Sequence, residues 1–258
     1  MILKRFCLNE GIGEWDSDAR KEERVLLTFC ASVADTRMRS ALRSAKLATD
    51  GVAQVAIVPV VERSTEPRLF AGILPVHVPF DWQAFSDWQG EKRAVCDART
   101  SDDAAAFSEL HGSSEVIRDM ICDAMLRGLQ RIPASFKLPI ETLGRIILEI
   151  QSSTYQLAWT HSSHRFAGLK LTARLDCLLL AGKFQLSLTV LRGKHIAWTK
   201  VIYSSWPESI FWHSNFKDVA LRGDSLVVTR RIPAFNPDRS LNHDLYTLPL
   251  NAIPIENA

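Results

Sequence analysis

The 258-residue sequence lacks the short motifs that most often identify an enzyme. It has no G-x-S-x-G nucleophile elbow, no P-loop, no G-x-G-x-x-G fingerprint and no H-E-x-x-H zinc motif. Its 12 glycines form no phosphate cradle, since Gly11-Ile12-Gly13 runs into Glu14 and Trp15 rather than into the start of a helix. These absences favour a non-catalytic protein but do not exclude an enzyme, and they indicate no cofactor.

Cysteine is scarce, scattered and odd in number. The five cysteines include no C-x-x-C pair and are Cys7, Cys30, Cys96, Cys122 and Cys177. Such a set, in a chain long enough to bury a core, is typical of reduced thiols in a cytosolic protein. Cys30 or Cys96 could in principle act as a nucleophile, but a buried and inert cysteine is the commoner case.

Long apolar runs are also missing. The apolar runs are only as long as a strand, which excludes a spanning helix. The first ten residues contain no apolar stretch of the length that a signal peptide needs. We therefore expect a cytoplasmic protein without a membrane partner.

Charge of one sign is not in excess. The sequence has 31 Lys and Arg against 29 Asp and Glu, so its net charge of +2 argues neither for nor against a nucleic-acid partner. The apolar fraction of 47% and the charged fraction of 23% are those of an ordinary globular protein.

What the sequence does contain is a clear alternation between Leu169 and Val190. Apolar residues from Leu169 to Leu179 fall on one face of an extended chain, Ala181-Gly182 interrupts, and the alternation resumes from Phe184. Because side chains of a strand point to opposite faces in turn, this pattern predicts a half-buried β-hairpin. Further turns at 192–194 and 222–224 extend it into an antiparallel meander over 153–258, with an extended tail from Pro233.

The first part, residues 1–152, mixes helical and strand patterns. In chain order we expect a strand at 25–31, a helix at 36–48 capped by Asp35, strands at 52–61 and 69–78, a helix from 113 or 114 to 131, and a strand at 145–151. This order matches the ferredoxin-like βαββαβ arrangement. Pro59 and Pro75 inside the middle strands, and the long stretch 79–112 with a short helix at 102–110, weigh against it.

The fold class is therefore predicted as α+β, with a ferredoxin-like N-terminal part and a C-terminal β-meander. The pattern leaves open whether the two parts are separate domains or one continuous domain.

His161 and His164 have a spacing that could serve a metal ion. A zinc site usually needs three or four ligands, and no further ligand pair stands at a matching spacing. We therefore interpret residues 160–165 as a polar turn between strands and predict no metal site.

The segment from Arg174 to Phe184 is similar to the metal-binding hairpin of restriction-endonuclease-like (PD-D/E-x-K) nucleases. In that family an Asp on the first strand and a Glu-x-Lys on the second hold Mg²⁺ and position water. The resemblance covers about 20 residues and maps Asp176 alone, because Ser187-Leu188-Thr189 or Thr189-Val190-Leu191 stands where the second carboxylate and the lysine belong. It implies a degenerate nuclease as one alternative.

Basic residues gather on one face of the helix expected at 36–48. Arg39, Arg43 and Lys46 fall at i, i+4 and i+7, opposite the apolar stripe of that helix. Such a face can bind phosphate, although a surface helix also needs charge simply to face water. A ferredoxin-like fold would add an analogy to RNA-binding proteins and endoribonucleases, so RNA or DNA binding is a second hypothesis.

Aromatic residues form two clusters in connecting segments. One cluster contains Trp82, Phe85 and Trp88, beside Phe80; the other contains Trp206, Phe211 and Trp212, beside Phe216. Tryptophan is enriched at interface hot spots, although these side chains could also cover the open faces of the sheets. The leading hypothesis is a non-catalytic intracellular interaction protein, such as an immunity-type antidote or a subunit of a complex.

Overall fold

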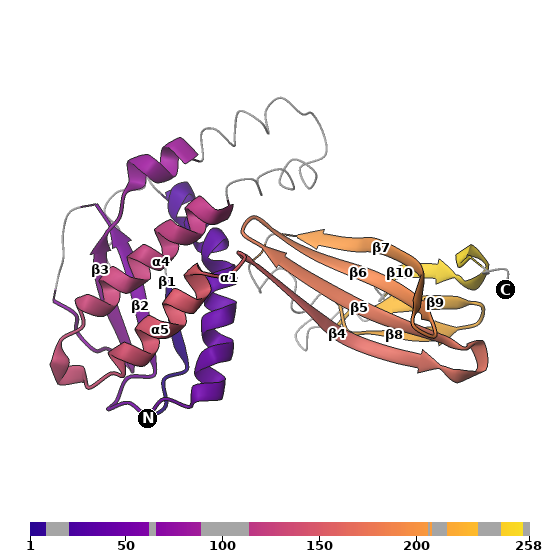
Figure 1. Ribbon diagram of the computed structural model, residues 1–258, viewed down its shortest axis with the longest axis horizontal. Coiled ribbons are helices and arrows are strands. Elements are labelled where there is room, and N and C mark those ends of the chain that lie inside the picture. Colours follow the sequence, from indigo (N-terminus) through magenta and orange to yellow (C-terminus); the bar gives the residue numbers. More distant parts are fainter. Residues whose placement is uncertain are drawn as a thin grey trace, which may run out of the picture. The chain divides into compact units, whose positions relative to one another are not determined.

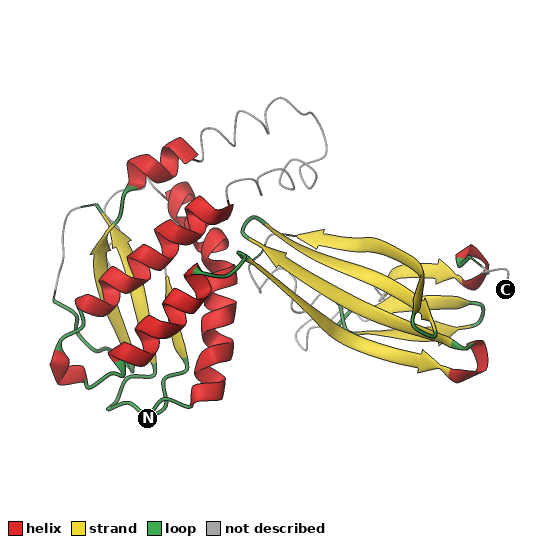
Figure 2. Ribbon diagram, viewed as in Figure 1, coloured by secondary structure: helices red, strands yellow, loops and turns green. Residues whose placement is uncertain are grey.

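The computed structural model describes residues 1–8, 21–61, 66–88, 114–205, 207, 216–231 and 244–254. The chain forms two compact units, one of Met1–Gln156 with Leu180–Gly182 and one of Leu157–Leu179 with Lys183–Ala258. Helices and strands both build the first unit, whereas strands dominate the second (Figures 1 and 2). The predicted α+β class is confirmed. Among the described helices, none combines the length and apolar composition needed to cross a membrane.

A parallel sheet lies at the centre of the first unit. Its strands β1 (Arg5–Leu8), β2 (Gln54–Val60) and β3 (Ile73–Pro79) lie in the order β1-β2-β3, and both pairs are parallel. Arg5 of β1 lies opposite Gln54 of β2, and Gln54 in turn lies opposite Ile73 of β3. The five inner residues of β2 are all buried, as the continuous apolar pattern of a central parallel strand predicts.

Three long helices pack with this sheet: α1 (Lys21–Ala45), α4 (Ser114–Gln130) and α5 (Ile140–Gln151). Helix α1 packs against β1, α4 contacts all three strands, and α5 packs against α4 and α1 (Figure 1). The predicted helix from 113 or 114 to 131 is thus confirmed in α4. A short helix also spans residues 82–88.

Two predicted strands are wrong, because both segments are helical. Residues 25–31 lie inside α1, so Asp35 is an interior helical residue and not a cap. Residues 145–151 lie inside α5, where Ile147 is buried and Leu148 is 54% exposed. A short apolar run cannot distinguish strand from helix by itself. The buried set does distinguish them, since Leu27, Ala31, Ala34, Met38 and Leu42 recur at helical spacing.

The ferredoxin-like topology is not found in the described residues, because the sheet is parallel and the last predicted strand is a helix. Pro75 lies in the edge strand β3, as expected. Pro59 lies in the central strand, but beyond Ile57, the last residue of β2 that pairs with β1. Its missing N–H therefore does not interrupt that ladder. The short helix expected at 102–110 lies outside the described residues.

The second unit contains two antiparallel sheets. One has the order β4-β5-β6-β7, formed by β4 (Gln156–Phe166), β5 (Leu171–Leu180), β6 (Lys183–Arg192) and β7 (His195–Ser205). The other has the order β10-β9-β8, formed by β8 (Asp218–Arg222), β9 (Ser225–Thr229) and β10 (Asp244–Pro249). Strand β5 alternates strictly between buried and half-buried residues, so the predicted hairpin is confirmed.

Aromatic contacts join these two sheets. Phe216, just before β8, stacks on Phe184 of β6 with ring centroids 5.7 Å apart, and Trp198 of β7 stacks on Tyr246 of β10 at 6.2 Å. The predicted polar turn at 160–165 is wrong, since these residues continue β4. Of the extended tail expected from Pro233, residues 232–243 lie outside the described part, and β10 follows them.

Close packing of α4 on β2 depends on Gly128 and generates a testable prediction. A Cβ added at Gly128 would lie 2.4 Å from Cδ1 of the buried Ile57, whereas one added at Gly144 in α5 would meet nothing closer than 3.9 Å. We expect Gly128→Ala to lower the free energy of unfolding by about 1–3 kcal/mol through overpacking. Gly144→Ala should raise it by up to about 1 kcal/mol through helix propensity.

Urea denaturation followed by circular dichroism measures both changes in parallel. Equal effects of the two substitutions would contradict this account of the α4–β2 contact.

Candidate functional site

The first aromatic cluster is internal to the first unit. Trp82, Phe85 and Trp88 are buried, and Phe85 lies with its ring centroid 6.2 Å from that of Trp82 and 5.7 Å from that of Trp88. Phe80 joins them, 4.9 Å from Trp82. These side chains therefore contribute to the core, and each is at most 9% exposed. Trp206, Phe211 and Trp212 lie outside the described residues.

The three predicted basic residues differ in their surroundings. Arg39 is half-buried on α1, and its charge acts on Asp35. Arg43 is exposed in the last turn of α1. Lys46 follows the helix in a left-handed conformation with φ 47°, and its N–H donates to the carbonyl of Leu42 at 3.0 Å. Two exposed cations thus lie at the C-terminal end of α1, where the helix dipole favours positive charge.

Asp35 lies one helical turn before Arg39 on α1 and forms an ion pair with Arg5. Nη2 of Arg5 donates to Oδ2 of Asp35 at 3.2 Å, and the Asp35 side chain is 14% exposed. Burial raises the pKa of the Asp35 carboxyl to about 6, although the charges of Arg5 and Arg39 act to lower it. The carboxyl is thus more costly to ionise in the folded protein than in the unfolded chain.

The thiols of the described cysteines are poor nucleophiles. Cys7, Cys30, Cys122 and Cys177 are free and buried. Burial raises the pKa of each of these thiols to about 12. Since the thiolate is the reactive form, no described cysteine is poised for catalysis. Cys96 lies outside the described residues.

The two histidines of β4 contact the strand segment that begins the second sheet. Nε2 of His161 lies 3.0 Å from the backbone oxygen of Lys217, and its ring packs edge-on against Phe216. His164 pairs with Asp218 at 2.5 Å. In the described parts of the chain, no three His, Cys, Asp or Glu side chains gather where a metal ion could be held.

Asp176 belongs to a polar row that crosses the four-stranded sheet. Both of its carboxylate oxygens lie within 2.9 Å of Nε of Arg174, and one accepts from Thr160 while the other accepts from Thr189. Thr189 also bonds to Thr199 on β7. The oxygens that would bind a metal in a nuclease are therefore occupied by neighbouring side chains. The nuclease resemblance has no geometric support in the residues described.

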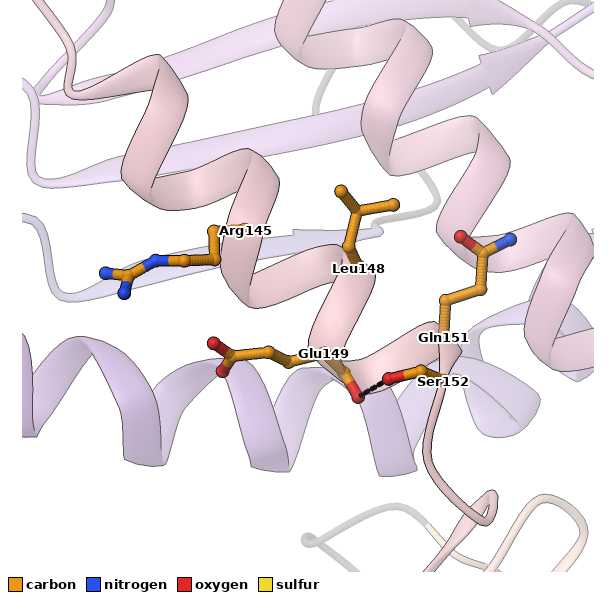
Figure 3. A pocket seen from close by; sticks show the side chains of 5 residues that line it. All are labelled: Arg145, Leu148, Glu149, Gln151 and Ser152. Carbon is orange, nitrogen blue, oxygen red and sulfur yellow. Dashed lines mark hydrogen bonds between the residues drawn. The ribbon is translucent and has the colours of Figure 1, made fainter.

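A hollow of about 490 Å³ lies on the exposed side of α5 (Figure 3). Its lining residues are Arg145, Leu148, Glu149, Gln151 and Ser152. Arg145 and Gln151 point in opposite directions (Figure 3), so the polar groups do not converge on one point. Such a surface does not resemble a ligand pocket, where a few polar groups fix an orientation.

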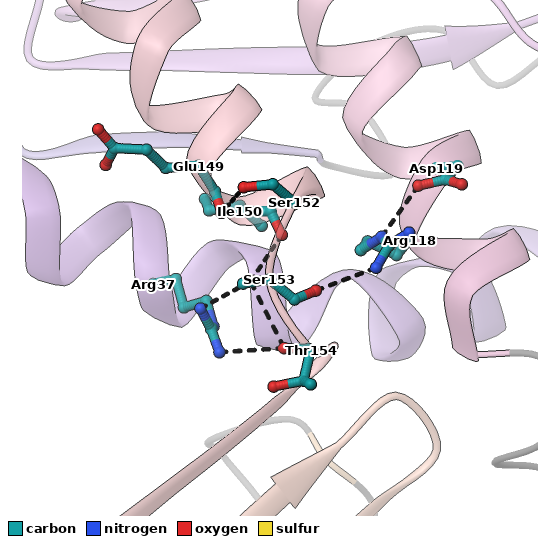
Figure 4. Close-up of polar contacts among 8 residues, drawn as sticks. All are labelled: Arg37, Arg118, Asp119, Glu149, Ile150, Ser152, Ser153 and Thr154. Atoms are coloured by element: carbon teal, nitrogen blue, oxygen red, sulfur yellow. Dashed lines mark hydrogen bonds and ion pairs between the residues drawn. The ribbon is translucent and has the colours of Figure 1, made fainter.

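The segment that follows α5 is tied to the first unit by two arginines (Figure 4). Arg37 of α1 donates to Oγ of Ser153 and to the carbonyls of Thr154 and Gln156, at 2.7–3.0 Å. Arg118 of α4 donates to the carbonyl of Ser153 at 3.0 Å. Tyr155 is buried, and its hydroxyl donates to the carbonyl of Cys30. These contacts explain why the first unit extends to Gln156.

A surface that the sequence did not suggest lies at the amino ends of the parallel strands. We define this amino-edge surface by Ile2, Lys4, Arg43, Lys46, Leu69 and Phe70. Phe70 is 75% exposed, Ile2 49% and Leu69 40%. With Met1, these make four of the ten exposed large apolar side chains among the described residues. Apolar exposure is thus concentrated at this edge, which is unusual for a surface that faces only water.

Phe70 is the first residue of a tight turn that leads into β3. The N–H and carbonyl of Phe70 bond with those of Ile73 at 2.9 and 2.8 Å, and Ala71 and Gly72 between them have φ of 48° and 81°. Positive φ at both central residues defines a type I′ turn. Leu69 and Phe70 therefore precede β3 instead of belonging to the strand predicted over 69–78. Ala71-Gly72 was the sequence signal that could have located this turn.

The loop over residues 46–53 connects the members of this surface. Ile2 forms an antiparallel bridge with Ala48, and the N–H of Lys4 donates to the carbonyl of Ala53 at 2.8 Å. A methyl group at Gly51 would lie 3.6 Å from Cδ2 of Leu69, so Leu69 covers Gly51. Figure 1 shows the N-terminus and these loops at the same end of the first unit.

The comparisons with protein-family models, curated proteins and solved structures found no match for this chain.

The buried Asp35 generates a prediction about pH. Its pKa in the folded protein, about 6, exceeds its ordinary value of 3.8, so its contribution to stability is present below about pH 4 and is lost as pH rises through 6. Asp35→Asn should remove this loss, which is on the order of 3 kcal/mol.

Urea denaturation at pH 4, 5, 6 and 7 measures the difference, with the exposed Asp123→Asn on α4 as the control. A pH slope of Asp35→Asn equal to that of the wild type would contradict the assignment.

Proposed function

We propose that this chain is a non-catalytic cytoplasmic protein that binds another protein through the amino-edge surface. The observation that carries the proposal is the exposed Phe70, held on a type I′ turn beside Leu69 and in the same surface as Ile2. Aromatic side chains are over-represented among interface residues that dominate binding energy. An immunity-type antidote and a subunit of a larger complex are roles of this class.

The turn gives Phe70 the properties of an anchor. Its backbone is fixed by two hydrogen bonds to Ile73, so binding would order little more than the ring. Burying an exposed phenylalanine side chain contributes about 1.5–3 kcal/mol, which corresponds to roughly 10- to 150-fold in affinity. The charged residues around it supply the polar rim that such interfaces have.

The proposal predicts that Phe70→Ala weakens binding to the partner at least 10-fold without unfolding the protein. A photo-crosslinking amino acid at position 70, expressed in the native cell, would first identify the partner by mass spectrometry. Position 148 is the matched control, because Leu148 is 54% exposed on α5. Calorimetric titration of the purified partner then compares Phe70→Ala with Leu148→Ala.

Crosslinking to one protein from position 70 alone, followed by the affinity loss, supports the proposal. The same set of adducts from both positions, or equal affinities of the two variants, would refute it.

Nucleic-acid binding is the second candidate, favoured by the exposed Arg43 and Lys46 at the end of α1. Cations on one exposed face can neutralise phosphates and release counterions. The argument for an endoribonuclease by fold analogy no longer applies, since the ferredoxin-like topology is not found.

This second candidate predicts that a 30-nucleotide RNA binds in 50 mM salt and that binding is lost in 300 mM salt. Arg43→Glu should abolish binding in a fluorescence anisotropy titration, while Arg145→Glu on α5 should not. Unchanged binding of the Arg43→Glu variant would exclude this face.

A further inference from the structure

We infer that the partner presents acidic residues opposite Lys4, Arg43 and Lys46, next to an apolar socket that receives Phe70. This inference rests on the proposed function and specifies the chemistry of the partner. It is carried by the juxtaposition of three exposed cations with the apolar part of one surface.

Backbone hydrogen bonds of neighbouring residues place these cations at the same edge of the first unit. Ile2 and Lys4 are exposed on either side of the buried Leu3, as the alternation of an extended segment dictates. The N–H of Leu3 donates to the carbonyl of Leu47 at 2.9 Å, so the backbone just before Lys4 bonds to the backbone just after Lys46. Arg43 lies one helical turn before Lys46.

These cations are available to a partner. Lys4, Arg43 and Lys46 are all exposed, and within the described ranges none of them forms an ion pair. Other arginines of the first unit do have acidic partners, as Arg5 has in Asp35 and Arg118 has in Asp119. Within the described residues, these three cations therefore have no ion-paired acidic side chain.

Acidic residues on the same edge favour a protein over a uniformly negative partner. Asp50 is exposed in the loop that joins Ala48 to Gly51, and Glu66 is exposed two residues before Arg68. A bilayer of anionic lipid or a phosphate backbone would bring negative charge against these carboxylates as well as against the cations. A protein can place its acids opposite Lys4, Arg43 and Lys46 alone, which makes the two surfaces complementary.

The cations and Phe70 are expected to act on different steps of binding, and kinetics can separate them. Exposed charges at the rim of an interface act mainly on the association rate, and salt screens them. A buried apolar anchor acts mainly on the dissociation rate. The cations and Phe70 should therefore affect different rate constants.

The experiment uses the full chain and the protein identified by crosslinking from position 70. Surface plasmon resonance at 50 and 300 mM salt compares the wild type with Phe70→Ala, with the double variant Arg43→Glu and Lys46→Glu, and with the control Arg145→Glu. We expect the double variant to lower the association rate at least 10-fold at 50 mM salt and to reduce its salt dependence. Phe70→Ala should raise the dissociation rate at least 10-fold, and Arg145→Glu should match the wild type.

The association rate could be unaffected by salt and by charge reversal while Phe70→Ala still weakens binding. That result would overturn the inference of an acidic partner and leave the proposed function standing. Absence of a crosslink specific to position 70 would overturn both. Both proposals would also be overturned if the wild type bound phosphatidylserine vesicles or the 30-nucleotide RNA and Phe70→Ala abolished that binding. Unchanged circular dichroism melting of each variant shows that the comparison is between folded proteins.

Discussion

Parallel pairing of β2 with both β1 and β3 is the constraint on which the first unit depends. A chain that pairs strands in parallel must return to the same end of the sheet before each new strand. Helix α1 makes the first return and residues 61–72 make the second. The end of α1, the loop before β2 and the turn before β3 therefore all meet at the amino edge. The surface containing Phe70 is a direct consequence of this connectivity.

The aromatic residues of the short helix that follows β3 are buried in the first unit. Trp82, Phe85 and Trp88 follow β3 and lie in the core, where their large apolar area stabilises the fold. An aromatic residue that is buried in the monomer cannot anchor a partner without unfolding part of the protein. Among the described residues at the strand ends, Phe70 is the most exposed large apolar side chain.

The second unit is organised by side-chain contacts across and between its sheets. Asp176 accepts hydrogen bonds from Thr160 and Thr189 on the two neighbouring strands, which fixes the register of the outer face. The stacking of Phe184 on Phe216 joins the other face to the second sheet. Residues that appeared in the sequence as candidates for metal chemistry therefore serve strand pairing and sheet packing.

Elements whose residue pattern allows a single interpretation could be predicted before the fold was known. The hairpin from Leu171 to Arg192 and helix α4 were predictable, because strict alternation suits only a strand and a long apolar stripe between caps suits only a helix. Short apolar runs were ambiguous, so residues 25–31 and 145–151 were predicted as strands and are helices. The direction of β3 relative to β2, the burial of Trp82 and the exposure of Phe70 became known only from the folded chain. Each depends on which segments meet in space, and local spacing carries no information about a contact between residues that are distant in the chain.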